Sequence, residues 1–81
     1  MDFESFKEIY ASKSPVEKLD LLLVQVDYYG IDQRDYAEAK YGRRNAEEAK
    51  YYYDESVAMM ERILWLRDEI EKALENQEEV E

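Results

Sequence analysis

The segment from Asn45 to Leu74 constrains the fold more than any other part of the chain, because its apolar residues recur at the spacing of an α-helix. They fall on one side of a helical projection and comprise Ala49, Tyr53, Val57, Met60, Ile63, Leu64, Ile70 and Leu74. A wide apolar stripe of this kind is typical of a helix that faces a protein core. We therefore expect a long helix here, on which the rest of the chain packs.

A second, narrower stripe lies on the other side of the same predicted helix. Tyr51, Ala58 and Trp65 recur every seven residues, which is close to two helical turns, and acidic side chains lie beside them at Asp54 and Glu61. Aromatic rings among carboxylates are typical of surfaces that bind basic proteins, because the rings supply contact area and the acids pair with Arg or Lys. These five residues are the predicted partner-binding site.

Two other interpretations of the aromatic stripe remain open. Tyr51 and Trp65 could pack against an N-terminal helix of the same chain, whose apolar residues are Phe3, Phe6 and Ile9. They could also form a self-association surface with a second copy. Apolar residues most often serve the fold, so packing within the chain carries the most weight of the three.

The clearest local signal is the start of a second helix at Pro15. Ser14 can cap this helix, Pro15 suits its first position, and Glu17 can close a capping box with Ser14. The residues that follow are apolar on nearly every side, so we expect this helix to be buried on both faces. Gly30 is expected to be its C-cap, because a residue without a Cβ adopts the left-handed conformation at no steric cost.

After that turn, Asp32 can cap a new helix, and a row of small residues leads in register into the apolar stripe. This favours one helix over about Gln33–Asn76, antiparallel to the second helix. A break is the alternative, because Gly42 weakens a helix interior and Asn45 resembles another N-cap. An unbroken helix of about 44 residues at 1.5 Å each would span roughly 65 Å, which is long for a domain of this mass.

The sequence thus predicts one all-α domain over residues 1–81, a small helical bundle with a possible kink at Gly42 to Asn45. A short N-terminal helix from Asp2 to Tyr10 precedes the buried second helix from Pro15 to Tyr29 and the long C-terminal helix. The second helix is expected to form the middle layer, between the long helix and either the first helix or a second protomer. Residues from about 76 to 81 are acidic and expected to fray.

Composition argues against an enzyme. The chain has no His and no Cys, so it lacks the usual general base, the usual soft metal ligands and any disulfide. Its serines have no evident activating partner, and it has no Gly-rich phosphate loop. We therefore expect no catalytic residue, no cofactor and no metal site.

Net charge limits the class of partner. The chain carries 21 acids and 11 bases, a formal charge of −10, which repels nucleic acid and anionic membranes at long range. Its only basic region, around Arg43 and Arg44, contains acids that can pair within the helix, such as Arg43 with Glu47 and Arg44 with Glu48. Direct nucleic-acid binding is therefore disfavoured. Met1–Tyr10 does not resemble a signal peptide, and the cytoplasm is the expected location.

Two functions follow as hypotheses. The first is a non-enzymatic inhibitor that occupies the basic surface of a nucleic-acid-binding protein, in the manner of immunity, anti-restriction or counter-defence proteins. Mimicry of a nucleic-acid duplex along the whole chain is weakened, because the last fourteen residues hold seven acids and one base. The second is a homo-oligomeric structural or assembly protein, such as a homodimer, that pairs through its long helix.

Overall fold

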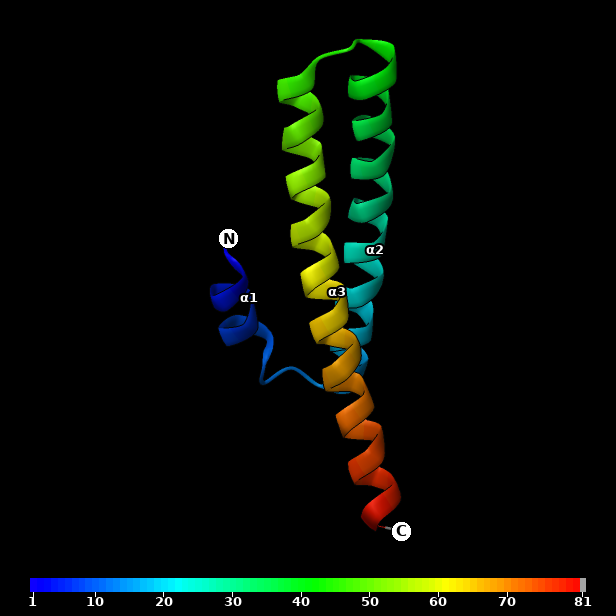
Figure 1. Cartoon of the computed structure of the whole chain (residues 1–81). Helices are drawn as coiled ribbons and strands as arrows, with labels where there is room; N and C mark the ends of the chain where they lie inside the picture. The colour runs from blue at the N-terminus through cyan, green and yellow to red at the C-terminus, as the bar shows by residue number, and fades with distance from the viewer. Residues whose placement is uncertain (81) are drawn as a thin grey trace.

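The protein is a helical hairpin with a short third helix packed against one side (Figure 1). The computed structural model describes the backbone of residues 1–80 and the side chains of residues 1–76. Its elements are the α-helix α1 (Phe3–Tyr10), the α-helix α2 (Pro15–Ala37), the π-helical turn η1 (Glu38–Gly42) and the α-helix α3 (Ala46–Val80). They form a rod of 55 × 21 × 14 Å. The all-α class is confirmed. The predicted fraying of residues from about 76 to 81 falls mostly on residues whose side chains lie outside the described part of the chain.

The predicted start of α2 is confirmed in detail. The Oγ of Ser14 accepts a hydrogen bond from the backbone N–H of Glu17 at 3.2 Å, and the carboxylate of Glu17 accepts one from the backbone N–H of Ser14 at 3.3 Å. The Ser14 hydroxyl also donates to the Glu17 carboxylate at 3.0 Å, and this bond together with the one from the Ser14 N–H holds the pKa of Glu17 below its usual value. The local sequence was sufficient here, because a capping box involves only residues three apart.

The predicted end of the second helix at Gly30 is wrong. α2 continues through Gly30 to Ala37, and η1 extends the helical path to Gly42. Neither glycine of the described backbone has a positive φ, so Gly30 is an ordinary helical residue and Asp32 does not cap a new helix. The helix over about Gln33–Asn76 is therefore also wrong. The chain reverses direction at residues 43–45, where the alternative interpretation placed a break.

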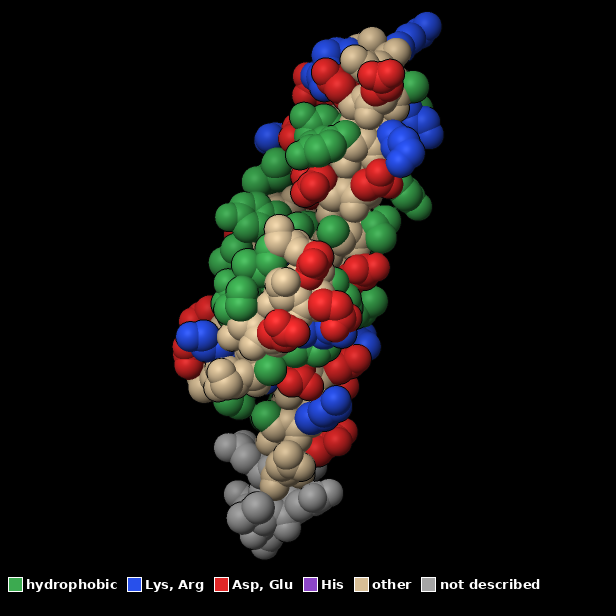
Figure 2. Space-filling view, turned by 90° about the vertical axis from the view of Figure 1, so that its left-hand side faces the viewer, with side chains coloured by type: hydrophobic (Ala, Val, Ile, Leu, Met, Phe, Trp, Pro, Cys, Tyr) green, Lys and Arg blue, Asp and Glu red, His purple; other side chains and the backbone are tan. Residues whose placement is uncertain are grey.

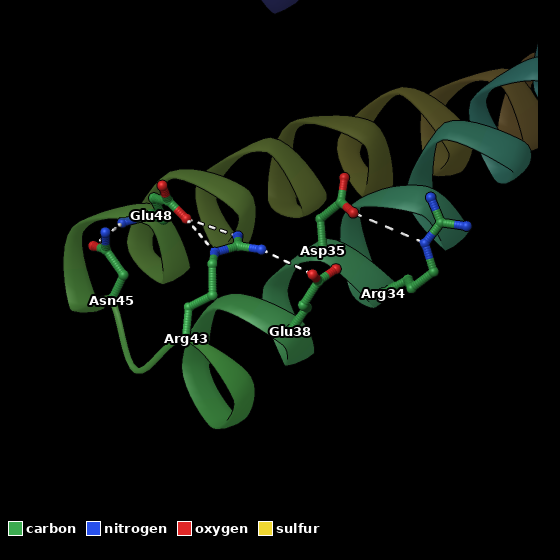
Figure 3. A network of polar contacts seen from close by, with 6 residues as sticks. All are labelled: Arg34, Asp35, Glu38, Arg43, Asn45 and Glu48. Carbon is green, nitrogen blue, oxygen red and sulfur yellow. Dashed lines mark hydrogen bonds and ion pairs between the residues drawn. The ribbon is translucent and has the colours of Figure 1, made fainter.

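The turn between η1 and α3 is held by side-chain contacts across it (Figure 3). The guanidinium of Arg43 pairs with Glu38 at 2.9 Å and with Glu48 at 2.7 Å, in place of the predicted pair with Glu47. Arg44 has the left-handed φ of 53°, and Asn45 accepts a hydrogen bond from the N–H of Glu48 at 3.1 Å. The N-cap role of Asn45 is thus confirmed, and the tight turn makes α2 and α3 antiparallel.

Polar side chains occupy much of the seam between α2 and α3. Lys18 and Gln25 of α2 and Ser56 of α3 are buried there, alongside Ala39, Ala49, Met59 and Leu66. Three contacts cross the seam: Lys18 with Glu69 at 3.3 Å, Gln25 with Arg62 at 3.5 Å, and Gln33 with Ser56 at 2.8 Å. No buried side-chain nitrogen or oxygen in the described residues lacks a partner. These contacts fix the register of the two helices, because a shift would leave polar atoms unpaired.

The face that α3 buries differs from the predicted apolar stripe. Tyr53 is 56% exposed, while Val57 and Leu64 are each 43% exposed; the buried residues are Ala49, Ser56, Met59 and Leu66. Ala49 belongs to the predicted stripe, and its members Met60, Ile63 and Ile70 are half-buried, so the seam takes in only one edge of that stripe. Ser56 explains the difference, because its hydroxyl bonds Gln33 and the carbonyl of Tyr52, and a hydrophobicity pattern gives no weight to such pairs.

α3, not α2, is the middle layer of the fold. α1 lies on one side of α3 and α2 on another (Figure 1), with Phe6 of α1 against Trp65 of α3. α2 buries one face only, and its apolar residues Leu23, Val24 and Tyr28 are more than 40% exposed. The expectation that both faces of α2 are covered is thus not met within one chain. None of the described helices combines the length and hydropathy needed to span a membrane.

Replacing Gly30 by Ala should stabilise the protein. Gly30 lies inside a continuous helix, and a Cβ added there would meet no atom within 4 Å. Because Ala is favoured over Gly inside helices, we expect the unfolding free energy to rise by about 1 kcal/mol and the melting temperature by about 5 °C. Urea unfolding measures the change in free energy and thermal unfolding the change in melting temperature, both at one fixed low protein concentration. A decrease of similar size would instead mean that Gly30 ends the helix.

Candidate partner-binding surface

Trp65 is half-buried by contacts within the chain. Its ring lies edge-to-face with Phe6, with centroids 6.0 Å apart, and the Nζ of Lys18 lies 5.9 Å from it. Phe6 is 2% exposed and is the residue through which α1 docks. The interpretation that Trp65 packs against the N-terminal helix is therefore confirmed, and this end of the predicted stripe is covered.

Arg62 anchors α1 and was missed by sequence analysis. Its guanidinium lies 4.9 Å from the centroid of the Phe6 ring, donates to the backbone carbonyl of Met1 at 2.7 Å, and reaches Gln25 of α2 at 3.5 Å. One side chain of α3 thus connects all three helices. Its role depends on contacts separated by 37 and 61 positions in the sequence, which no local pattern could reveal.

The other four predicted site residues remain accessible. Tyr51 is 60% exposed and meets only the edge of Tyr52, with ring centroids 5.3 Å apart. Ala58 is half-buried, and Asp54 and Glu61 are exposed. Asp54 forms an ion pair with Lys50 at 2.8 Å. Helical spacing places these residues on the side of α3 away from α2, so they can meet a partner without opening the hairpin.

Carboxylates of both long helices influence one another electrostatically at Asp32 and Glu55. Asp32 of α2 is half-buried, and its pKa is raised by burial and by the negative charges of Glu55 on α3 and Asp35 on α2. In the described residues, neither Asp32 nor Glu55 has a Lys or Arg within 4.0 Å, whereas Asp35 contacts Arg34 at 3.8 Å. Sequence analysis missed this cluster because it assigned Asp32 to a helix cap.

We call the surface formed by the accessible predicted residues and this cluster the aromatic–acidic face. Its members are Tyr51, Asp54, Ala58, Glu61, Asp32 and Glu55. Figure 2, seen from the side on which α1 lies, shows acidic side chains along the middle of the rod and hydrophobic side chains gathered along one edge. Within the described residues, no group of three acids is arranged to hold a metal ion. The rings and carboxylates of this face can contact apolar groups and organic cations.

Removing the Phe6 ring should release α1 from α3. We expect Phe6→Ala to lower the unfolding free energy by up to about 3 kcal/mol, because a buried aromatic ring is lost, and to shift Trp65 emission to longer wavelength. Phe3→Ala is the matched control on the same helix, since Phe3 is only half-buried and contacts Lys7; its effect on emission should be smaller. Unchanged emission in Phe6→Ala would contradict the observed docking.

Neutralising Asp32 should stabilise the protein at neutral pH. Because burial and two neighbouring carboxylates raise the pKa of Asp32 above its ordinary value of 3.8, the folded state loses stability as the pH rises through that pKa. Asp32→Asn removes this loss, so its melting temperature should exceed the wild-type value at pH 7 and approach it below pH 3.8. Asp27→Asn, at an exposed position of the same helix, should change less. Equal effects of the two variants at pH 7 would argue against the cluster.

The chain matches no protein-family model, no curated protein and no solved structure. A function for it therefore rests on the geometry and charge of the described residues.

Proposed function

We propose that this chain is a non-enzymatic protein–protein interaction module whose aromatic–acidic face binds a basic protein surface. The observation that carries the proposal is the exposed ring of Tyr51, one helical turn from Glu55, whose carboxylate acts on that of Asp32. Neither carboxylate has a cationic partner among the described residues. A Tyr supplies a large contact area at low entropic cost. An Arg or Lys from a partner would supply the charge that the carboxylates lack.

Electrostatics favour the same class of partner. The formal charge of −10 accelerates association with a basic protein and opposes association with nucleic acid or an acidic protein. A cation placed between Asp32 and Glu55 would also relieve their mutual repulsion, which is part of the cause of the raised pKa of Asp32. Charge therefore contributes both to the rate of encounter and to the specificity of the complex.

In its most concrete form, the proposal is an inhibitor that covers the basic groove of a nucleic-acid-binding protein. Such grooves are lined with Lys and Arg that contact phosphates. A rod 55 Å long equals the length of about 16 base pairs at 3.4 Å each, so one copy could occupy a groove of ordinary size. The functional class proposed here is that of immunity, anti-restriction or counter-defence proteins.

The alternative function, oligomerisation through the line of Tyr51, Ala58 and Trp65, is less well supported. Phe6 packs on Trp65, so α1 occupies one end of the surface that a symmetric partner would need. The part of this line that stays accessible is flanked by Asp54 and Glu61. Two copies joined there would bring like charges together.

Charge reversal on α3 tests the proposal. We expect the double variant Asp54→Lys with Glu61→Lys to weaken binding to a basic partner by about a hundredfold, because like charges are placed across the interface. The measurement is a titration against partners that the wild-type chain retains from nuclease-treated lysate of its host, after each has been purified. Far-UV circular dichroism should show unchanged helicity.

Asp20→Lys with Asp27→Lys provides a matched control. These two acids are exposed on α2 and lie seven residues apart, as Asp54 and Glu61 do on α3, so both double variants change the net charge equally. The control should lose only the general electrostatic attraction, which salt screens. If both double variants weaken binding equally, net charge alone acts and the aromatic–acidic face is not the site.

A further inference from the structure

The flank of the hairpin away from α1 is apolar at most of its positions. On α2, the residues that helical spacing places on this flank comprise Val16, Leu19, Leu23, Val26, Gly30, Gln33 and Ala37. On α3, they comprise Tyr53, Val57, Met60 and Leu64. We call this surface the acid-free face. These eleven positions are uncharged in a chain with 21 acids among 81 residues, and Lys50, Glu61, Asp68 and Glu71 of α3 border them.

The acid-free face is exposed and hollowed along the line where the two helices meet. Leu23 is 55% exposed, and Leu19 and Val26 are similarly accessible. A shallow groove of about 200 Å³ lies between the helices and is lined by Tyr29, Gln33, Tyr53, Ser56, Val57 and Met60. No element of the described chain covers it, since α1 packs at Trp65 and Arg62 on the other flank. A contiguous apolar surface of this kind marks an association site.

We propose that the acid-free face joins two copies of this chain into a dimer with four long helices. Charge argues for a second copy as the occupant. Two chains of formal charge −10 repel one another wherever acids face acids, and on this face the acids Glu61, Asp68 and Glu71 lie only along the edge. A basic partner would find few carboxylates here to pair with its cations.

The charged residues at the ends of the face suit a two-fold axis. Lys50 and Glu71 lie on the same edge of α3 as Val57 and Leu64, because all four are separated by multiples of seven residues. Consider a two-fold axis that is perpendicular to the rod and crosses α3 between Met60 and Glu61. This axis places Lys50 of each copy opposite Glu71 of the other. The same axis places Val57 opposite Leu64, so one patch is complementary to itself, as an isologous interface requires.

Burial of more apolar surface would stabilise the hairpin further. Leu66 is the largest fully buried side chain among the described residues, and three of the buried seam positions are polar. Two helices of this kind bury little apolar surface, whereas four-helix bundles enclose a shared core. Gly30 lies on the acid-free face with open space at its missing Cβ. It would allow a helix of the second copy to approach closely, although it costs stability in an isolated helix.

Sedimentation equilibrium and light scattering of the full chain over a wide range of concentration test the proposal. We expect a mass of twice 9.8 kDa at high concentration and dissociation on dilution. Leu23→Glu should raise the dimer dissociation constant at least about a hundredfold, because the two-fold axis places the new charge in the interface twice. Val57→Glu, on α3, should do the same.

Val24→Glu is the matched control. Val24 is adjacent to Leu23 and is 43% exposed compared with 55%, but it points to the other flank of α2, so its variant should dimerise like the wild type. Circular dichroism confirms that each variant is helical. A wild-type chain that stays at 9.8 kDa at high concentration overturns the proposal, as does a dimer that Val24→Glu disrupts and Leu23→Glu does not.

Discussion

The polar contacts between α2 and α3 fix the alignment of the two helices, and this alignment decides which residues of each helix stay on the surface. Lys18 with Glu69, Gln25 with Arg62, and Gln33 with Ser56 pair residues that face each other across the hairpin. Such pairs add little net stability, because each polar group loses its hydration when it is buried. Their effect is on register, since any other alignment would leave these groups unpaired. The residues of α3 that lie between its two flanks therefore pack against α2, and both flanks stay on the surface.

The two flanks expose different kinds of side chain, so they suit different partners. One flank combines the ring of Tyr51 with carboxylates from both helices, and Phe6 covers its Trp65 end. The other presents aliphatic and aromatic side chains around the groove at Tyr53 and Met60 without any acid. A basic protein surface fits the first flank and an apolar helical surface fits the second.

Sequence analysis succeeded where the determining contacts are local and failed where they cross the hairpin. The capping box of Ser14 and the cap of Asn45 each involve residues three apart, so the residues alone predicted them. The class of the fold followed from helical periodicity. Gly30 was misjudged because glycine is compatible with both a helix end and a helix interior. The buried side of α3 depends on the bond from Gln33 to Ser56, 23 positions apart, and the anchoring role of Arg62 depends on still longer separations.

The aromatic–acidic face is itself a product of the hairpin, because its carboxylates come from two helices. Asp32 belongs to α2 and Glu55 to α3, so their proximity exists only while the register of the seam is maintained. Local opening of the hairpin would separate the two carboxylates. Anything that binds only the closed hairpin therefore stabilises the face as well. A second copy on the acid-free face would act in this way, and the two proposed interactions are linked through the register of α2 and α3.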